Sequence, residues 1–329
     1  MLRRSCYVIV CLIAASVTAS AASLDKALVS KDAKWLLFVD VAQLRSSSIG
    51  QRLREQHAGS EQATRKLAEL KHMLAIESWD DLHGILLYGT NFRKGDGAVI
   101  INAKSDQQAI TERLLEAQDY KASKNGNNTV HTWTHDDGKT LSLMFYPGGH
   151  GVLSGNRRDF DHAIAVLDGE KPNLEGSGGL QAAAPAGASI YLEVQGPIVP
   201  EDNPNAPPFL ALIHHMTVSL VHREQDVTLS VAAVTADADT ALQLQQILEG
   251  FQAVALLQQL QQQQQHENGD PTMTDATRAI RIKASDNVVR LKWQLTNEQA
   301  VSVMQYNERM KLIRQSRRQQ SKPEAAKSP

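Results

Sequence analysis

The sequence predicts an α+β protein made of two diverged copies of one antiparallel sheet with helices packed on one face. Short apolar segments separated by turn signals such as Asn125-Gly126-Asn127 are typical of hairpins. Apolar residues at a period of 3.6 between these segments indicate helices. A stretch rich in glycine, proline and alanine at 169–188 reads as a linker or surface connection, and a similar order of elements precedes and follows it.

The first segment, 1–21, has the three parts of a cleaved secretory signal peptide. Arg3 and Arg4 precede an apolar run, and Ala19-Ser20-Ala21 is a small-residue cleavage site. The apolar run of roughly ten residues is too short to cross a bilayer about 30 Å thick. We therefore expect cleavage near Ala21, export to the periplasm or the medium, and no transmembrane segment in the mature chain.

The composition of the mature chain excludes several kinds of chemistry. Both cysteines, Cys6 and Cys11, lie inside the signal, so the secreted chain is cysteine-free and has neither disulfides nor a thiolate nucleophile. Removing Arg3 and Arg4 leaves 32 basic against 36 acidic residues, a net charge of −4. A chain with this charge offers no positive field that would recruit nucleic acid.

The first unit, 22–168, opens with a buried strand at Trp35–Val41. We expect its core helix after Ser105, which forms a capping box with Gln108 and leaves Ile110 and Leu114 on the buried face. The other expected elements are helices at 49–58, 60–75 and 157–167 and strands at 82–88, 98–103, 118–123, 129–134, 140–146 and 150–153.

The second unit, 189–313, repeats this order from a strand at 189–194. Hairpins are expected at 217–221 with 227–234 and at 279–284 with 288–295, and Thr296 and Gln299 form a capping box for a last helix. The residues expected on the buried face of a long helix at 237–262 are Leu244, Ile247, Leu248, Phe251, Val254 and Ala255. A single α+β unit with a coincidental rhythm is the alternative. The basic tail 314–329 is expected to be disordered.

No motif predicts a catalytic residue, a cofactor or a metal site. His131 and His135 have a helical ligand spacing, but a strand separates them by about 13 Å. The adjacent His214 and His215 do not easily face one ion. Ser23-Leu24-Asp25-Lys26 and Ser285-Asp286-Asn287 match two motifs of penicillin-recognising enzymes, but the third motif is missing and the second match is a hairpin turn.

The segment Val39–Gly50 runs from a strand into the pattern D-x-x-x-L-R-x-S-x-I-G. It resembles the opening of exported bacterial proteins of unknown function, in which a strand–helix–hairpin scheme is repeated along the chain. The resemblance implies export and internal duplication, and it implies no activity.

These observations favour a non-enzymatic envelope or extracellular protein that binds a ligand or a protein partner. Two copies of one unit would form a groove between them, and an apolar groove would suit a lipid-like or peptide ligand. One alternative is a structural or assembly factor of the cell envelope. Another is a hydrolase acting on an envelope polymer, with carboxylates and histidines that only folding brings together.

Overall fold

The computed structural model describes residues 24–58, 68, 75–93, 95–135, 138–146, 149–175, 179–196, 207–265 and 271–306. The predicted signal peptide at 1–21, nearly all of the predicted helix at 60–75 and the predicted tail at 314–329 lie outside these residues.

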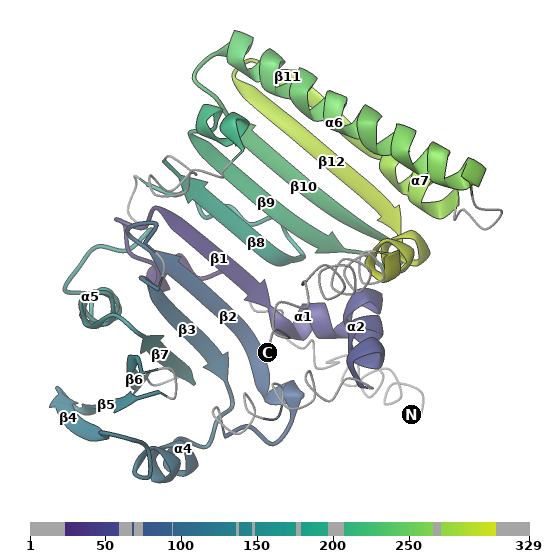
Figure 1. Cartoon of the computed structure of the whole chain (residues 1–329). Coiled ribbons are helices and arrows are strands. Elements are labelled where there is room, and N and C mark those ends of the chain that lie inside the picture. The colour runs from purple at the N-terminus through teal and green to yellow at the C-terminus, as the bar shows by residue number, and fades with distance from the viewer. Residues whose placement is uncertain are drawn as a thin grey trace, which may run out of the picture.

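The strands form one twelve-stranded antiparallel sheet in the order β11-β12-β10-β9-β8-β1-β2-β3-β7-β6-β5-β4 (Figure 1). The first half of the chain contributes β1 (Trp35–Asp40), β2 (Leu82–Gly89), β3 (Ala98–Ala103), β4 (Lys121–Asn125), β5 (Asn128–Thr134), β6 (Thr140–Tyr146) and β7 (His150–Ser154). The second half contributes β8 (Ala188–Gln195), β9 (His215–His222), β10 (Asp226–Val234), β11 (Ile280–Ser285) and β12 (Val288–Thr296).

Apart from α6 (Ala238–Gln265), which has 28 residues, the described helices are short. The α-helices are α1 (Val41–Ser46), α2 (Ser48–Ala58), α4 (Gln107–Leu114), α5 (Arg157–Leu167), α6 (Ala238–Gln265), α7 (Pro271–Arg278) and a last helix at 297–306. Short 3-10 helices lie at η2 (Lys26–Leu28), η3 (Trp79–Asp81) and η4 (Pro208–Leu212). The predicted α+β class is confirmed.

The two predicted units share one sheet, which the sequence did not indicate. The opening strands of the two halves, β1 and β8, pair with each other at its centre, with Leu37 opposite Leu192. From Trp35 to Val39, β1 carries apolar side chains on both faces, which is typical of a strand in the interior of a sheet. The pairing order β1-β2-β3-β7 on one side parallels β8-β9-β10-β12 on the other. The internal duplication remains a prediction.

The connection at 169–188 is not a surface linker in its described part. Leu174, Leu180 and Ala182 are buried and belong to the main hydrophobic core. These apolar residues are spaced among the glycines and prolines, and they pack on the same face of the sheet as α5. That core also contains Phe160 of α5 and Met144 of the sheet.

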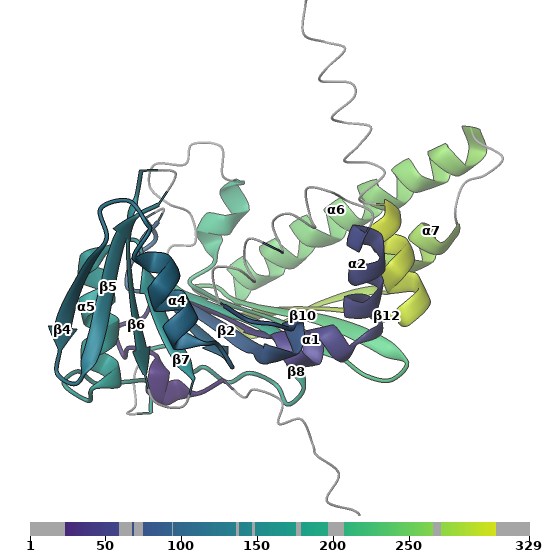
Figure 2. The same ribbon diagram turned by 90° about the horizontal axis from the view of Figure 1, so that it is seen from below.

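The two faces of the sheet carry different elements. In Figure 2, α4 and α6 rise on one side of the sheet, above a floor made by central strands that include β2, β8 and β10. We call this side the trough face. The other side, the outer face, carries α5 and the connection at 179–184 over the first half of the sheet. On the outer face of β12, the exposed Arg290, Lys292 and Gln294 alternate with apolar residues that point to the trough face.

The segment with the D-x-x-x-L-R-x-S-x-I-G pattern forms the corner between β1, α1 and α2. The buried Asp40 accepts a hydrogen bond from the Gln43 amide and caps α1, and Ser47 accepts one from the Gly50 amide. Arg45 donates to the carbonyl of Trp79 and forms an ion pair with Asp80. The pattern therefore encodes a structural corner.

Gly50 is the tightest position of this corner. A Cβ there would overlap the carbonyl oxygen of Leu44, because α1 and α2 meet at this point. Gly50→Ala is expected to lower the free energy of unfolding by about 1–3 kcal/mol through overpacking. Gly250→Ala in α6 is the matched control, since nothing lies within 4 Å of the added methyl group. It should raise the stability by up to about 1 kcal/mol. Urea unfolding of both variants checks the prediction, and equal effects would contradict it.

Some local predictions are confirmed and others are wrong. Thr296 and Gln299 form the predicted reciprocal capping box. The N-cap of α4 is Asp106, one residue after the predicted Ser105. Its carboxylate accepts a hydrogen bond from the Ala109 amide. A charged acceptor at a helix N-terminus is favoured by the helix dipole. The predicted core residue Ile110 is buried.

Candidate functional site

The trough face carries rows of aliphatic side chains that cross the centre of the sheet. In one row, Leu87, Leu37, Leu192, Val218 and Val231 stand directly opposite one another on neighbouring strands. A second row runs beside it. We define the trough floor as the members of both rows in β1, β2, β8, β9 and β10 that join no packed cluster of the described residues. They are Leu37, Val39, Leu87, Ile190, Leu192, Val218, Leu229 and Val231.

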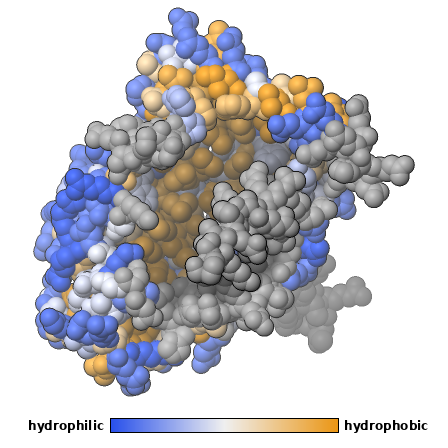
Figure 3. Space-filling model, in the orientation of Figure 1, coloured by the Kyte–Doolittle hydropathy of each residue, from blue (hydrophilic) through white to orange (hydrophobic). Residues whose placement is uncertain are grey.

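The trough floor is partly exposed along its whole length. Each of its side chains is neither buried nor fully exposed. Figure 3 shows an apolar hollow in the middle of this face, and apolar surface appears again along α6. The helix α6 contacts β11 and β12 and α4 contacts β5, beyond the two ends of the rows, and α1 contacts β1, β2 and β8. A partly exposed apolar surface of this kind is typical of a binding site.

The long helix α6 is apolar on nearly all sides, and the predicted buried face is wrong in part. Leu244 is buried and Leu248 packs beside it, but Ile247, Phe251 and Val254 are exposed. Leu242, Leu257 and Leu260 are exposed as well, so apolar residues did not mark one face. Within the described residues, neither α6 nor another helix has both the length and the hydropathy to span a membrane.

The outer face has an open cavity of about 1000 Å³ beside the η2 segment. Buried Phe38, Leu86 and Ile100 line it together with the polar His83 and His150. Its mixed lining distinguishes it from the apolar trough.

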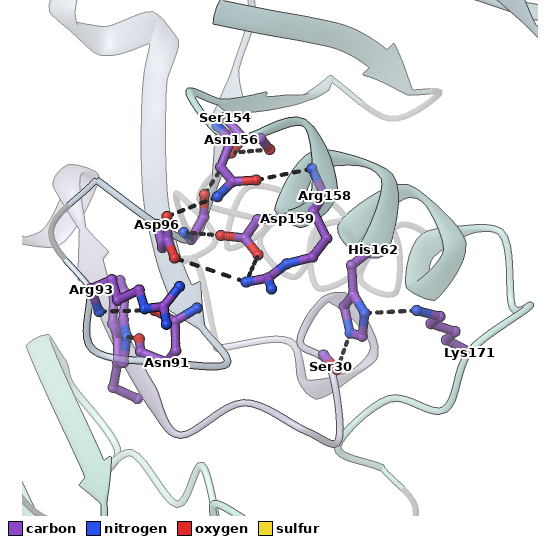
Figure 4. Close-up of polar contacts among 12 residues, drawn as sticks. Ser30, Asn91, Arg93, Asp96, Ser154, Asn156, Arg158, Asp159, His162 and Lys171 are labelled. Carbon is purple, nitrogen blue, oxygen red and sulfur yellow. Dashed lines mark hydrogen bonds and ion pairs between the residues drawn. The ribbon is translucent and has the colours of Figure 1, made fainter.

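Figure 4 shows a serine–histidine pair formed by Ser30, which precedes β1, and His162 of α5. Ser30 Oγ lies 2.7 Å from His162 Nε2, and Lys171 Nζ lies 2.9 Å from His162 Nδ1. Because an ammonium group only donates, Nδ1 accepts and Nε2 carries the proton toward Ser30. A general base needs the opposite arrangement. Burial and then the charge of Lys171 lower the pKa of His162, which favours the neutral ring. The pair ties the N-terminal segment to α5.

The other contacts in Figure 4 hold the loop before β3 against the start of α5. The buried Asp159 accepts a hydrogen bond from the Gly97 amide at 2.7 Å, and Asn156 donates to Asp96 at 2.8 Å. Asn156 is also the N-cap of α5. The cluster is therefore explained by packing and helix capping.

The histidines noted in the sequence do not come together. His131 is buried in β5 and bonds Tyr120, whereas His135 lies beyond the end of that strand. His214 is exposed, and its neighbour His215 bonds a buried carboxylate. Among the described residues, no three metal-ligating side chains are grouped to hold an ion.

That buried carboxylate is Glu193 of β8, which the sequence did not single out. Its side chain is 0% exposed and accepts hydrogen bonds from the amides of Gln181 and Ala182, from Tyr191 and from His215, at 2.7–2.9 Å. Burial alone would raise the pKa of Glu193, but these four donors outweigh it and hold the pKa below its ordinary value. Glu193 therefore locks the 169–188 connection to the centre of the sheet.

The fold is similar to that of a solved protein. The structure of crystal form III of TP0453 matches with a TM-score of 0.50 at 10% identity, covering 86% of this chain and 98% of that chain. Crystal form IV of TP0453 gives a TM-score of 0.48 at 11% identity. No protein-family model and no curated protein matches the chain. The likeness supports the α+β fold alone, and the resemblance of segment 39–50 to exported proteins remains a prediction.

Proposed function

We propose that this chain is a non-enzymatic protein, exported to the cell envelope or the medium, that binds an elongated apolar ligand such as a fatty-acyl chain along the trough floor. The observation that carries this proposal is the row of partly exposed aliphatic side chains that crosses five neighbouring strands and joins no packed cluster within the part of the chain that the structure describes. With strands spaced about 4.8 Å apart, the floor is about 19 Å wide, which accommodates most of a long acyl chain.

The chemistry of the floor favours an acyl chain over a peptide. The backbone groups of central strands are paired within the sheet, so an extended peptide would find no hydrogen-bond partners there. A peptide that buried its own amides against aliphatic side chains would lose free energy for each unpaired group. An acyl chain has no such groups, and each methylene removed from water contributes about 0.8 kcal/mol.

Fluorescence of the apolar probe N-phenyl-1-naphthylamine tests the proposal. The purified protein should enhance the emission of the probe, and fatty acids should displace it. Affinity should rise by about fourfold for each added methylene until the floor is filled. No enhancement, or displacement that does not depend on chain length, would contradict binding of an acyl chain along the floor.

A further inference from the structure

We propose that the outer face of β11 and β12 is a docking surface for an anionic lipid bilayer. Four exposed cations stand on this face, Arg281 and Lys283 on β11 and Arg290 and Lys292 on β12. We call them the basic patch. The inference does not depend on the proposed acyl-chain site, which lies on the opposite face of the sheet.

The register of the two strands places like charges directly opposite each other. Arg281 pairs with Lys292, and Lys283 pairs with Arg290. Directly opposed like charges destabilise a sheet. None of the four forms an ion pair with a carboxylate among the described residues, and Arg281 instead donates to the backbone carbonyl of Arg278.

Protection of the sheet edge does not account for the patch. Lysines on an edge strand commonly prevent aggregation. However, Arg290 and Lys292 lie on β12, which is paired on both sides. Two outward backbone groups of β11 are engaged by α6, because Gln245 accepts from the Ala284 amide and Gln252 donates to the Ile280 carbonyl. The opposed cations lower the stability of the sheet, and protection of its edge does not explain why they are present. We infer that they contact a partner.

The shape and charge of the patch favour a membrane surface. On this face the one acidic residue of β10, β11 and β12 is Asp226, at the start of β10, where it accepts a hydrogen bond from Gln294. The neighbours of the patch, such as Ser230 and Ala232, are small. The two cations on each strand are about 7 Å apart, and the two strands are about 5 Å apart. Long, flexible cationic side chains on such a surface can each reach a phosphate of the lipid headgroups. Each cation is expected to increase partitioning of the protein onto the membrane by about fivefold.

Sedimentation with vesicles tests this inference. The protein should bind vesicles of phosphatidylcholine with one quarter phosphatidylglycerol and not vesicles of phosphatidylcholine alone, and added salt should release it. The K283E/K292E double variant should lose at least about 25-fold in partitioning. The control is K121E/K124E, which makes the same change in net charge on the exposed strand β4 at the other edge of the sheet.

Stability of the same variants separates docking from a structural role. K283E faces Arg290 and K292E faces Arg281, so both relieve a like-charge pair and should raise the midpoint of thermal unfolding while vesicle binding falls. Equal losses of binding in both double variants, or no binding of anionic vesicles by the wild type, would overturn the proposal. Binding to poly-L-glutamate without binding to vesicles would overturn it in favour of an acidic protein partner. If the wild-type protein binds anionic vesicles but does not enhance the emission of N-phenyl-1-naphthylamine, docking is supported and only the acyl-chain site is contradicted.

Discussion

Val231→Asp is expected to weaken binding of an apolar probe or fatty acid by at least about tenfold. Val231 stands on the trough floor, opposite Val218 on β9 and Leu291 on β12. A carboxylate there would have to lose its water when a ligand covers the floor, and this desolvation costs several times the roughly 1.4 kcal/mol that a tenfold loss requires. Titration of N-phenyl-1-naphthylamine into wild type and variant measures the effect.

Ser230→Asp is the matched control. Ser230 is the preceding residue on the same strand, points to the outer face and stands opposite Lys292, so a carboxylate is tolerated there. It should leave probe binding unchanged. If Val231→Asp unfolds the protein, Val231→Thr keeps the shape of the side chain and should still weaken binding. Equal binding by the Val231 and Ser230 variants would place the ligand away from the floor.

Glu193→Ala is expected to lower the free energy of unfolding by about 3–5 kcal/mol. The substitution leaves the Gln181 and Ala182 amides, the Tyr191 hydroxyl and His215 without their shared acceptor. Loss of one partner from a buried charged network is among the largest effects of single substitutions. Urea unfolding measures it, and Gln195→Ala at the exposed end of the same strand should change stability by less than about 0.5 kcal/mol.

The same network makes stability depend on acidity. The pKa of Glu193 is lower in the folded protein than in the unfolded chain, so its contribution is fully present above the ordinary carboxyl pKa of about 4.3. The contribution is lost as the pH falls from that value through the folded pKa. In Glu193→Gln, the free energy of unfolding should therefore decrease less steeply as the pH falls below about 4.3. An unchanged acid profile in this variant would show that other carboxylates produce it.

Local features of the fold could be predicted from the sequence because their causes are local. The turn at Asp286-Asn287 and the capping box of Thr296 and Gln299 depend on residues within a few positions of each other. The pairing of β1 with β8 joins residues about 150 positions apart, and no local pattern encodes it. The lock on Glu193 likewise depends on amides of the connection, which composition alone described as a linker.

The trough was hidden from the sequence for a different reason. A strand with apolar side chains on one face has the same pattern whether that face packs against a helix or stays partly exposed, as Leu192 and Val218 do. The long helix raises the same difficulty, because Phe251 and Leu244 are equally apolar and only one is buried. The basic patch had a visible signal in the Arg-x-Lys spacing shared by Arg281 and Arg290, but only the register places the two pairs together.

Native mass spectrometry of the protein purified from its own host tests the central claim most directly. We expect the mass of the chain plus a discrete adduct, which collisional activation releases as a molecule bearing a fatty-acyl chain. The adduct should be absent from Val231→Asp and present in Ser230→Asp. A bare chain in the wild type, or an adduct retained equally by both variants, would contradict a ligand on the trough floor.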